Sequence, residues 1–134
     1  MRRIPLWLLL LGAAVVVLGV LWQAFTIAAY VRGAGDGALD AHLTGSFFVH
    51  AGQLAIVVGA IWAWWGTWTR VALAVVFLVV CFAQLAFLGD TDEQGDWING
   101  LHGFLALVIL LAGAWYFTQA RRELGIGSRP GAVV

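Results

Sequence analysis

Four long apolar runs, separated by short polar segments, dominate the chain. They cover residues 4–30, 42–65, 71–88 and 98–117. Each run meets the requirement of roughly 20 residues for a helix that crosses a hydrocarbon layer about 30 Å thick. The connection at residues 66–70 is long enough only for a tight turn, so the second and third helices form an antiparallel hairpin. The pattern predicts an all-α, four-helix transmembrane bundle with up-down-up-down topology.

The composition points to the same class of protein. Of the 134 residues, 63% are hydrophobic and 10% are charged, and a soluble domain of this length cannot bury that much apolar surface. The formal net charge is zero, so the chain carries no basic footprint for nucleic acid. The first run is free of charge over residues 4–31, much longer than the ~7–15 apolar residues of a signal peptide. We therefore predict one integral membrane domain over residues 1–134, with a tail at 120–134.

The placement of charges predicts the orientation in the bilayer. One side carries most of the arginines and the other carries most of the acidic residues. The positive side is cytoplasmic by the positive-inside rule, which places both termini in the cytoplasm and two acidic loops outside. Every basic residue is an arginine, a bias that suggests a GC-rich bacterium and hence the bacterial plasma membrane. The positive side holds Arg2, Arg3, Arg70, Arg121, Arg122 and Arg129 with Glu123, and the other holds Arg32, Asp36, Asp40, Asp90, Asp92, Glu93 and Asp96.

The two halves of the chain resemble each other. In each half an apolar run carries a glutamine near its end, an acidic loop follows, and a histidine lies near the start of the next run. Gln23 precedes His42 by 19 residues, and Gln84 precedes His102 by 18. Because each half contains two spans, both copies have the same orientation. The similarity indicates two parallel two-helix repeats about an axis along the membrane normal.

Polar side chains inside the spans need a partner, because lipid offers none. At 100° per residue, His42, Ser46 and Gln53 lie along one stripe of the second span, which we expect to face the bundle interior. Gly45 flanks His42 on this face, and small residues likewise follow His102 on the fourth span. Small neighbours leave room beside an imidazole ring, and a flat cofactor needs such room.

The positions of the histidines favour heme as that cofactor. In an up-down-up-down bundle the second and fourth helices are diagonal neighbours, and His42 and His102 lie at similar depths near the outer face. They can therefore take both axial positions of one heme iron. Gln23 and Gln84, on the other diagonal, could contact the macrocycle edge or a propionate. His50 lies about 12 Å deeper than His42, and could be an alternative ligand that pairs with His102 or a polar contact to a substrate.

Simpler interpretations exist for all of these residues. Intramembrane histidines and glutamines often hydrogen-bond between helices, and we favour such packing for Ser46 and Gln53. The acidic loop residues could bind a divalent cation, although a solvated loop explains them equally well. Cys81 lies in an apolar run, where we expect a buried, inert thiol. The tryptophans at the end of the second run predict an interfacial aromatic belt; they are Trp62, Trp64, Trp65 and Trp68.

Short motifs add a resemblance to a known family. At Gln23, His42-Leu43-Thr44-Gly45, Gln84 and Leu101-His102-Gly103 the chain resembles a family of small bacterial four-helix membrane proteins, which looks like half of a heme A synthase. The resemblance covers residues 4–119 and implies a four-helix fold with paired histidines, His42 and His102, near the outer face. Heme A synthase has two such halves and an acidic catalytic residue, whereas this chain matches one half and carries no intramembrane carboxylate. The resemblance therefore implies heme b binding rather than heme A synthesis.

Together these patterns predict a small membrane cytochrome with one heme b, active in electron transfer or heme handling at the outer face. Its partners would be the lipid bilayer and a redox partner or a larger membrane complex. The alternative from another class is a cofactor-free accessory subunit that packs against a larger membrane complex. Whether the chain is an enzyme is left open by the sequence.

Overall fold

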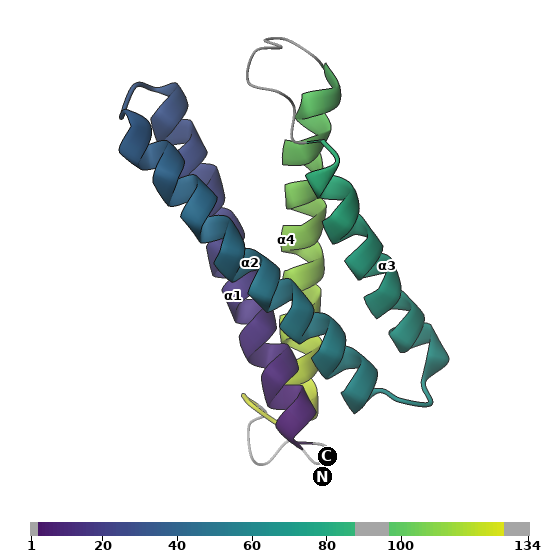
Figure 1. Cartoon of the computed structure of the whole chain (residues 1–134). Helices are drawn as coiled ribbons and strands as arrows, with labels where there is room; N and C mark the ends of the chain where they lie inside the picture. The colour runs from purple at the N-terminus through teal and green to yellow at the C-terminus, as the bar shows by residue number, and fades with distance from the viewer. Residues whose placement is uncertain (1–2, 88–96, 128–134) are drawn as a thin grey trace.

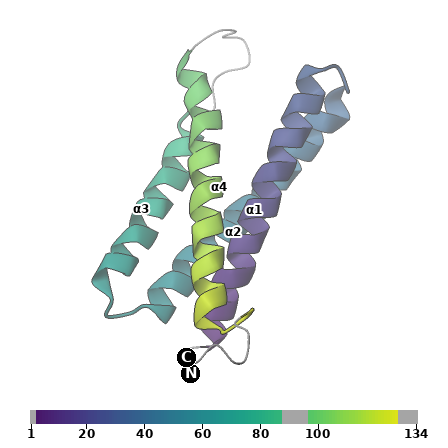
Figure 2. The ribbon, with the colours of Figure 1, turned by 180° about the vertical axis from the view of Figure 1, so that it is seen from behind.

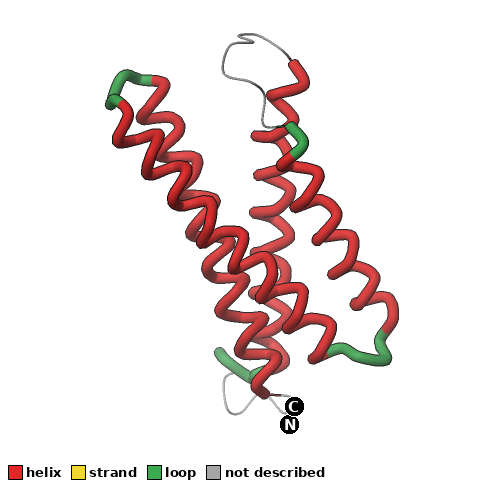
Figure 3. Tube along the Cα trace, in the orientation of Figure 1, coloured by secondary structure: helices red, strands yellow, loops and turns green. Residues whose placement is uncertain are grey.

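The computed structural model describes residues 3–87 and 97–127, excluding the side chains of residues 97–99. Four helices follow one another along the chain (Figures 1 and 3): α1 Arg3–Val31, α2 Asp36–Ala63, α3 Trp68–Leu85 and α4 Trp97–Glu123. All four are long and apolar enough to cross a membrane. The structure thus confirms the predicted all-α four-helix bundle and its multi-pass membrane character.

The helices form a ring in which α1 contacts α2 and α4, and α3 contacts the same two helices. This order leaves α2 and α4 on one diagonal. The hairpins α1–α2 and α3–α4 lean apart toward the connection between α1 and α2, in both views (Figures 1 and 2). We call this the open end of the bundle. The opposite end, where α1 begins, α4 ends and the chain turns from α2 into α3, is the arginine-rich end, because Arg3, Arg70 and Arg121 lie there.

The closest contact in the bundle joins α1 to α2, and glycines permit it. A Cβ atom on Gly12 would lie 2.9 Å from the carbonyl oxygen of Gly52, and a Cβ on Gly59 would lie 2.8 Å from the backbone nitrogen of Leu9. The two backbones therefore pack without side chains between them, as small-residue stripes allow in membrane helices. Beyond this contact, the bundle centre is filled by Leu9, Val16, Ile56, Ile109 and Tyr116, all of them fully buried.

A polar network ties α2, α3 and α4 together at the arginine-rich end. The indole N–H of Trp64 donates to both carboxylate oxygens of Glu123, over 3.0 and 3.2 Å. Arg70 forms an ion pair with the same carboxylate and places its guanidinium 4.8 Å from the Trp64 ring centroid. Trp64 is only 4% exposed, which corrects its assignment to an interfacial belt. Its neighbours Trp62, Trp65 and Trp68 are exposed, as a belt requires.

The helices extend beyond the predicted apolar runs at several ends. α2 begins at Asp36, before the run that starts at His42, so Asp36 and Asp40 are helical and exposed rather than part of a loop. α4 continues to Glu123 and ends in a Schellman motif around Gly125, whose φ is 74°. There the N–H of Ile126 donates to the carbonyl of Arg121, and the N–H of Gly125 to that of Arg122. The predicted tail is thus ordered at its start, and residues 128–134 lie outside the described part.

Candidate cofactor site

A cavity of about 340 Å³ lies at the open end, between the two hairpins. All four helices contribute to its wall. It contains the five side chains that the sequence singled out, together with Ser46 and a set of apolar residues. The polar lining consists of Gln23, His42, Ser46, His50, Gln84 and His102, and the apolar lining includes Val20, Ile27, Leu43, Val49, Leu85 and Leu107.

Gln23 and His42 contact each other reciprocally across the α1–α2 interface. The side-chain amide of Gln23 donates to the backbone carbonyl oxygen of His42 over 2.7 Å. In return, Nδ1 of His42 lies 3.0 Å from the backbone carbonyl oxygen of Gln23. The backbone carbonyl of each residue thus holds the side chain of the other. The contact sets the position of the imidazole ring relative to the wall of the cavity.

The same arrangement recurs across the α3–α4 interface. The amide of Gln84 donates to the backbone carbonyl oxygen of His102 over 3.3 Å, and Nδ1 of His102 lies 3.1 Å from the carbonyl oxygen of Gln84. The four atoms involved are the same in both hairpins. This match supports the internal repeat inferred from the sequence, because the two Gln–His pairs occupy equivalent places in two equivalent hairpins. We call each arrangement a Gln–His clasp.

The clasp determines which imidazole nitrogen carries the proton. A carbonyl oxygen can only accept a hydrogen bond, so Nδ1 of His42 and of His102 must be the protonated nitrogen in the neutral ring. Nε2 then keeps its lone pair, and among the described residues it has no hydrogen-bond partner in either ring. A neutral imidazole that donates from one nitrogen to a backbone carbonyl, with the other nitrogen available, is the usual form of a metal-ligating histidine.

His50 lies deeper in the same cavity and is held differently. Its Nδ1 lies 2.8 Å from Oε1 of Gln53, one turn further along α2. Gln53 is 3% exposed, and its Nε2 is buried without a hydrogen-bond partner in the described part of the chain. A buried amide without a hydrogen-bond partner costs stability. His50 and Gln53 thus form a polar pair at the base of an otherwise apolar region.

The structure changes the interpretation of several predicted residues. The space beside Gly45 is filled, because a Cβ there would lie 2.8 Å from the amide nitrogen of Gln23. Gly45 therefore permits the clasp instead of leaving room for a cofactor. Room exists beside Gly103, where a Cβ would meet nothing within 4 Å and which lines the cavity. Each clasp uses one N–H of the amide of Gln23 or Gln84. An amide carries two N–H donors, so the predicted contact to a propionate stays a prediction.

Sequence reasoning missed Thr26. Its side chain is 3% exposed, and its hydroxyl donates to the carbonyl oxygens of Trp22 and Gln23 at 3.0 and 3.2 Å. The same hydroxyl lies 3.5 Å from Nδ1 of His42. The available signal was its spacing of three residues from Gln23, which puts both on one face of α1. The predicted packing role of Ser46 agrees with its local hydrogen bond to the carbonyl of Leu43, although the residue also lines the cavity.

The cavity contains two residues that could serve as axial ligands to a heme. Within the described ranges, no group of three or more His, Cys, Asp or Glu side chains is placed to hold an ion. A heme brings four equatorial nitrogens and needs only axial ligands from the protein, and the clasped imidazoles of His42 and His102 are of the right chemical kind. The apolar walls match the faces of a macrocycle.

Other candidate groups do not join this site. Cys81 is buried and free, in the apolar core. Asp36 and Asp40 are exposed on α2, while Asp90, Asp92, Glu93 and Asp96 of the other acidic loop lie outside the described residues. Comparison of the whole chain with protein-family models, curated proteins and solved structures found no match.

Proposed function

We propose that this protein is a small membrane cytochrome that binds one heme b in the open-end cavity, with His42 and His102 as axial ligands. The observation that carries the proposal is the duplicated Gln–His clasp. Two imidazoles held by the same contacts, one from each hairpin, line one cavity. Polar packing between helices does not require a second copy of the same contact. Two axial ligands to one iron require two imidazoles, and the two clasps supply one from each hairpin.

The side chains of the clasps would prepare the imidazoles for ligation. The hydrogen bond from Nδ1 to a carbonyl oxygen orients each ring and increases the basicity of Nε2. It also spares the cost of ordering the ring when a ligand binds. When bound, the heme would supply one-electron chemistry whose potential depends on ligands and burial. The apolar walls, among them Val20, Val49 and Leu107, would limit the access of water to the site.

The proposed location follows from the distribution of charge. Arg3, Arg70 and Arg121 lie at the end of the bundle opposite the cavity, and the positive-inside rule assigns that end to the cytoplasm. The cavity would then lie near the outer face of a bacterial plasma membrane. A heme there is suited to exchange electrons, or heme itself, with a partner at that face. The sequence resemblance to half of a heme A synthase supports this proposal, because the similar motifs include His42 and His102.

Ligation is tested by spectra of single variants. We expect His42→Gly and His102→Gly each to lose the low-spin reduced spectrum while the protein still accumulates in the membrane. Added imidazole should restore that spectrum, because it can occupy the space of the missing ring. Ser46→Ala is the matched control, since it alters the lining of the cavity without removing an imidazole, and it should keep the wild-type spectrum.

His50→Ala separates the two possible depths of the site. We expect a milder change than at His42, because Nδ1 of His50 is held by Gln53 and not by a clasp. Loss of the low-spin spectrum at His50 and His102, with His42 silent, would move the iron deeper along α2. No heme in the wild-type protein, expressed with an adequate heme supply, would contradict the cytochrome and favour the accessory subunit.

A further inference from the structure

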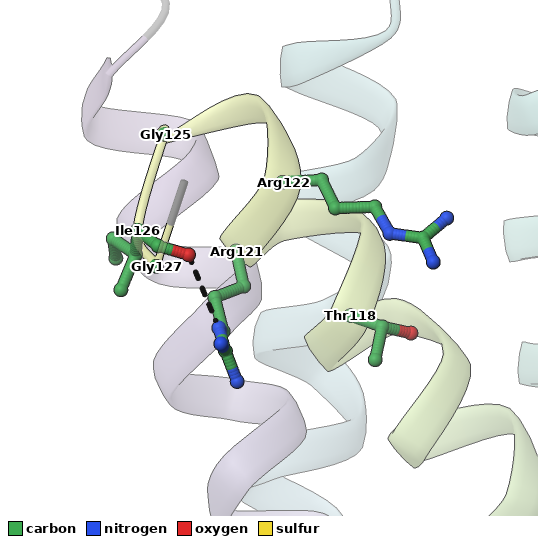
Figure 4. A pocket seen from close by; sticks show the side chains of 6 residues that line it. All are labelled: Thr118, Arg121, Arg122, Gly125, Ile126 and Gly127. Carbon is green, nitrogen blue, oxygen red and sulfur yellow. Dashed lines mark hydrogen bonds between the residues drawn. The ribbon is translucent and has the colours of Figure 1, made fainter. Parts of the chain in front are cut away.

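The arginine-rich end carries a second cavity, far from the Gln–His clasps. It has a volume of about 390 Å³ and lies at the C-terminal end of α4. Its lining consists of Thr118, Arg121, Arg122, Gly125, Ile126 and Gly127 (Figure 4). These residues take no part in the proposed heme site. Two guanidinium groups on one cavity are donors that recognise a phosphate, whereas the hydroxyl of Thr118 donates to the carbonyl oxygens of Ala114 and Trp115.

The backbone that follows α4 holds Arg121 in place. After the Schellman motif the chain turns back over the arginine, and Nε of Arg121 donates to the carbonyl oxygen of Ile126 over 3.2 Å (Figure 4). Gly127, at φ 87°, comes so close that a Cβ on it would lie 2.6 Å from a terminal nitrogen of Arg121. The remaining N–H groups of this guanidinium have no side-chain partner among the described residues. Arg121 is therefore positioned but not neutralised.

Arg122 and Thr118 lie together on another side of the helix end, one turn apart (Figure 4). The guanidinium of Arg122 forms no hydrogen bond or ion pair within residues 3–87 and 97–127. The nearest acid in sequence, Glu123, is engaged with Arg70 and Trp64. Among the residues that the structure describes, no carboxylate lines the cavity, so none of them compensates its positive charge.

The face of α4 below Arg122 has the character of a lipid contact. Leu111, Trp115, Thr118 and Arg122 follow one another at spacings of four, three and four residues, which places them along one line of the helix. Leu111 and Trp115 are exposed. An apolar strip that leads to a guanidinium matches an acyl chain joined to a phosphate headgroup. A free phosphate ion would need the cationic end only.

We propose that this cavity binds the headgroup of an anionic phospholipid, with Arg121 and Arg122 on two sides of the phosphate and an acyl chain along Leu111 and Trp115. Tryptophan and arginine at the end of a membrane helix lie at headgroup depth, where anionic lipid is plentiful. The site differs from a general basic surface, because Arg121 is fixed by a backbone carbonyl oxygen and the acid nearest in sequence is paired elsewhere.

The proposal is tested by native mass spectrometry of the purified full chain, with phosphatidylglycerol titrated against phosphatidylcholine. We expect phosphatidylglycerol to be retained preferentially by the wild type. Each arginine near a membrane surface adds about a fivefold preference for anionic lipid, so Arg121→Gln/Arg122→Gln should weaken binding about 25-fold. Arg122→Gln alone breaks no contact within the described residues, so its expected fivefold loss does not depend on a change in folding.

Arg32→Gln is the matched control, because it removes the same charge at the opposite end of the bundle. It should bind phosphatidylglycerol like the wild type. If Arg32→Gln and the double variant lost phosphatidylglycerol binding equally, the effect would depend on net charge alone and the proposed site would be wrong. Displacement of phosphatidylglycerol by an equal concentration of inorganic phosphate would identify a free-anion site and overturn the lipid assignment.

Discussion

The contact between α1 and α2 makes a quantitative prediction about stability. In Gly59→Ala the new Cβ would lie 2.8 Å from the backbone nitrogen of Leu9, 3.0 Å from its Cα and 3.0 Å from the carbonyl oxygen of Pro5. All three neighbours are backbone atoms, so no rotation of a side chain can relieve the clash. The two helices must move apart, and overpacking of this kind costs about 1–3 kcal/mol.

Gly100→Ala is the control for this experiment, because a Cβ at Gly100 meets nothing within 4 Å. Both substitutions gain up to about 1 kcal/mol of helix propensity, so their difference isolates the clash. The free energy of unfolding can be measured by titration with dodecyl sulfate in mixed micelles, followed by tryptophan fluorescence. We expect Gly59→Ala to be about 1–3 kcal/mol less stable than Gly100→Ala. Equal stability of the two variants would refute the close backbone approach.

Three further predictions concern orientation, the cofactor cavity and the polar network. Cysteine at Gly37 should react with an impermeant thiol reagent in intact cells and cysteine at Thr67 should not; labelling at 67 would reverse the proposed orientation. Gly103→Leu should fill the open-end cavity and abolish heme loading, whereas Gly100→Leu should not. If Gly103→Leu bound heme normally, the assignment of the heme to this cavity would be wrong. Glu123→Gln should cost about 0–1 kcal/mol of stability, because its ion pair is partly exposed; a loss above ~2 kcal/mol in the micelle titration would contradict that value.

The fold could be predicted because lipid restricts the structures that a membrane-spanning sequence can adopt. A polar group in a span must face protein, so the histidines and glutamines had to turn inward. The structure agrees, with Gln23, His42, Gln84 and His102 on one cavity. Helix ends were harder to predict, because hydropathy reports depth in lipid and not backbone conformation. α2 therefore starts at Asp36, outside its apolar run.

The details that escaped prediction depend on contacts between distant segments. Trp64 is buried because Glu123, 59 residues later, accepts its indole N–H. Gly45 carries no spare volume because the amide of Gln23 lies against it. The reciprocity of the Gln–His clasps requires the rotation of each helix about its axis, which spacing alone does not determine. In contrast, the repeat itself was visible as a pattern in the chain.

The central claim, that the open-end cavity holds one heme b between two clasped histidines, is tested most directly by the absorbance spectrum of the purified wild-type protein. The protein should be expressed with an added heme precursor, and the spectrum recorded before and after dithionite, with heme quantified as its pyridine complex. We predict one heme b per chain and a low-spin spectrum in both redox states. A colourless protein, or a high-spin heme with a single protein ligand, would contradict the account.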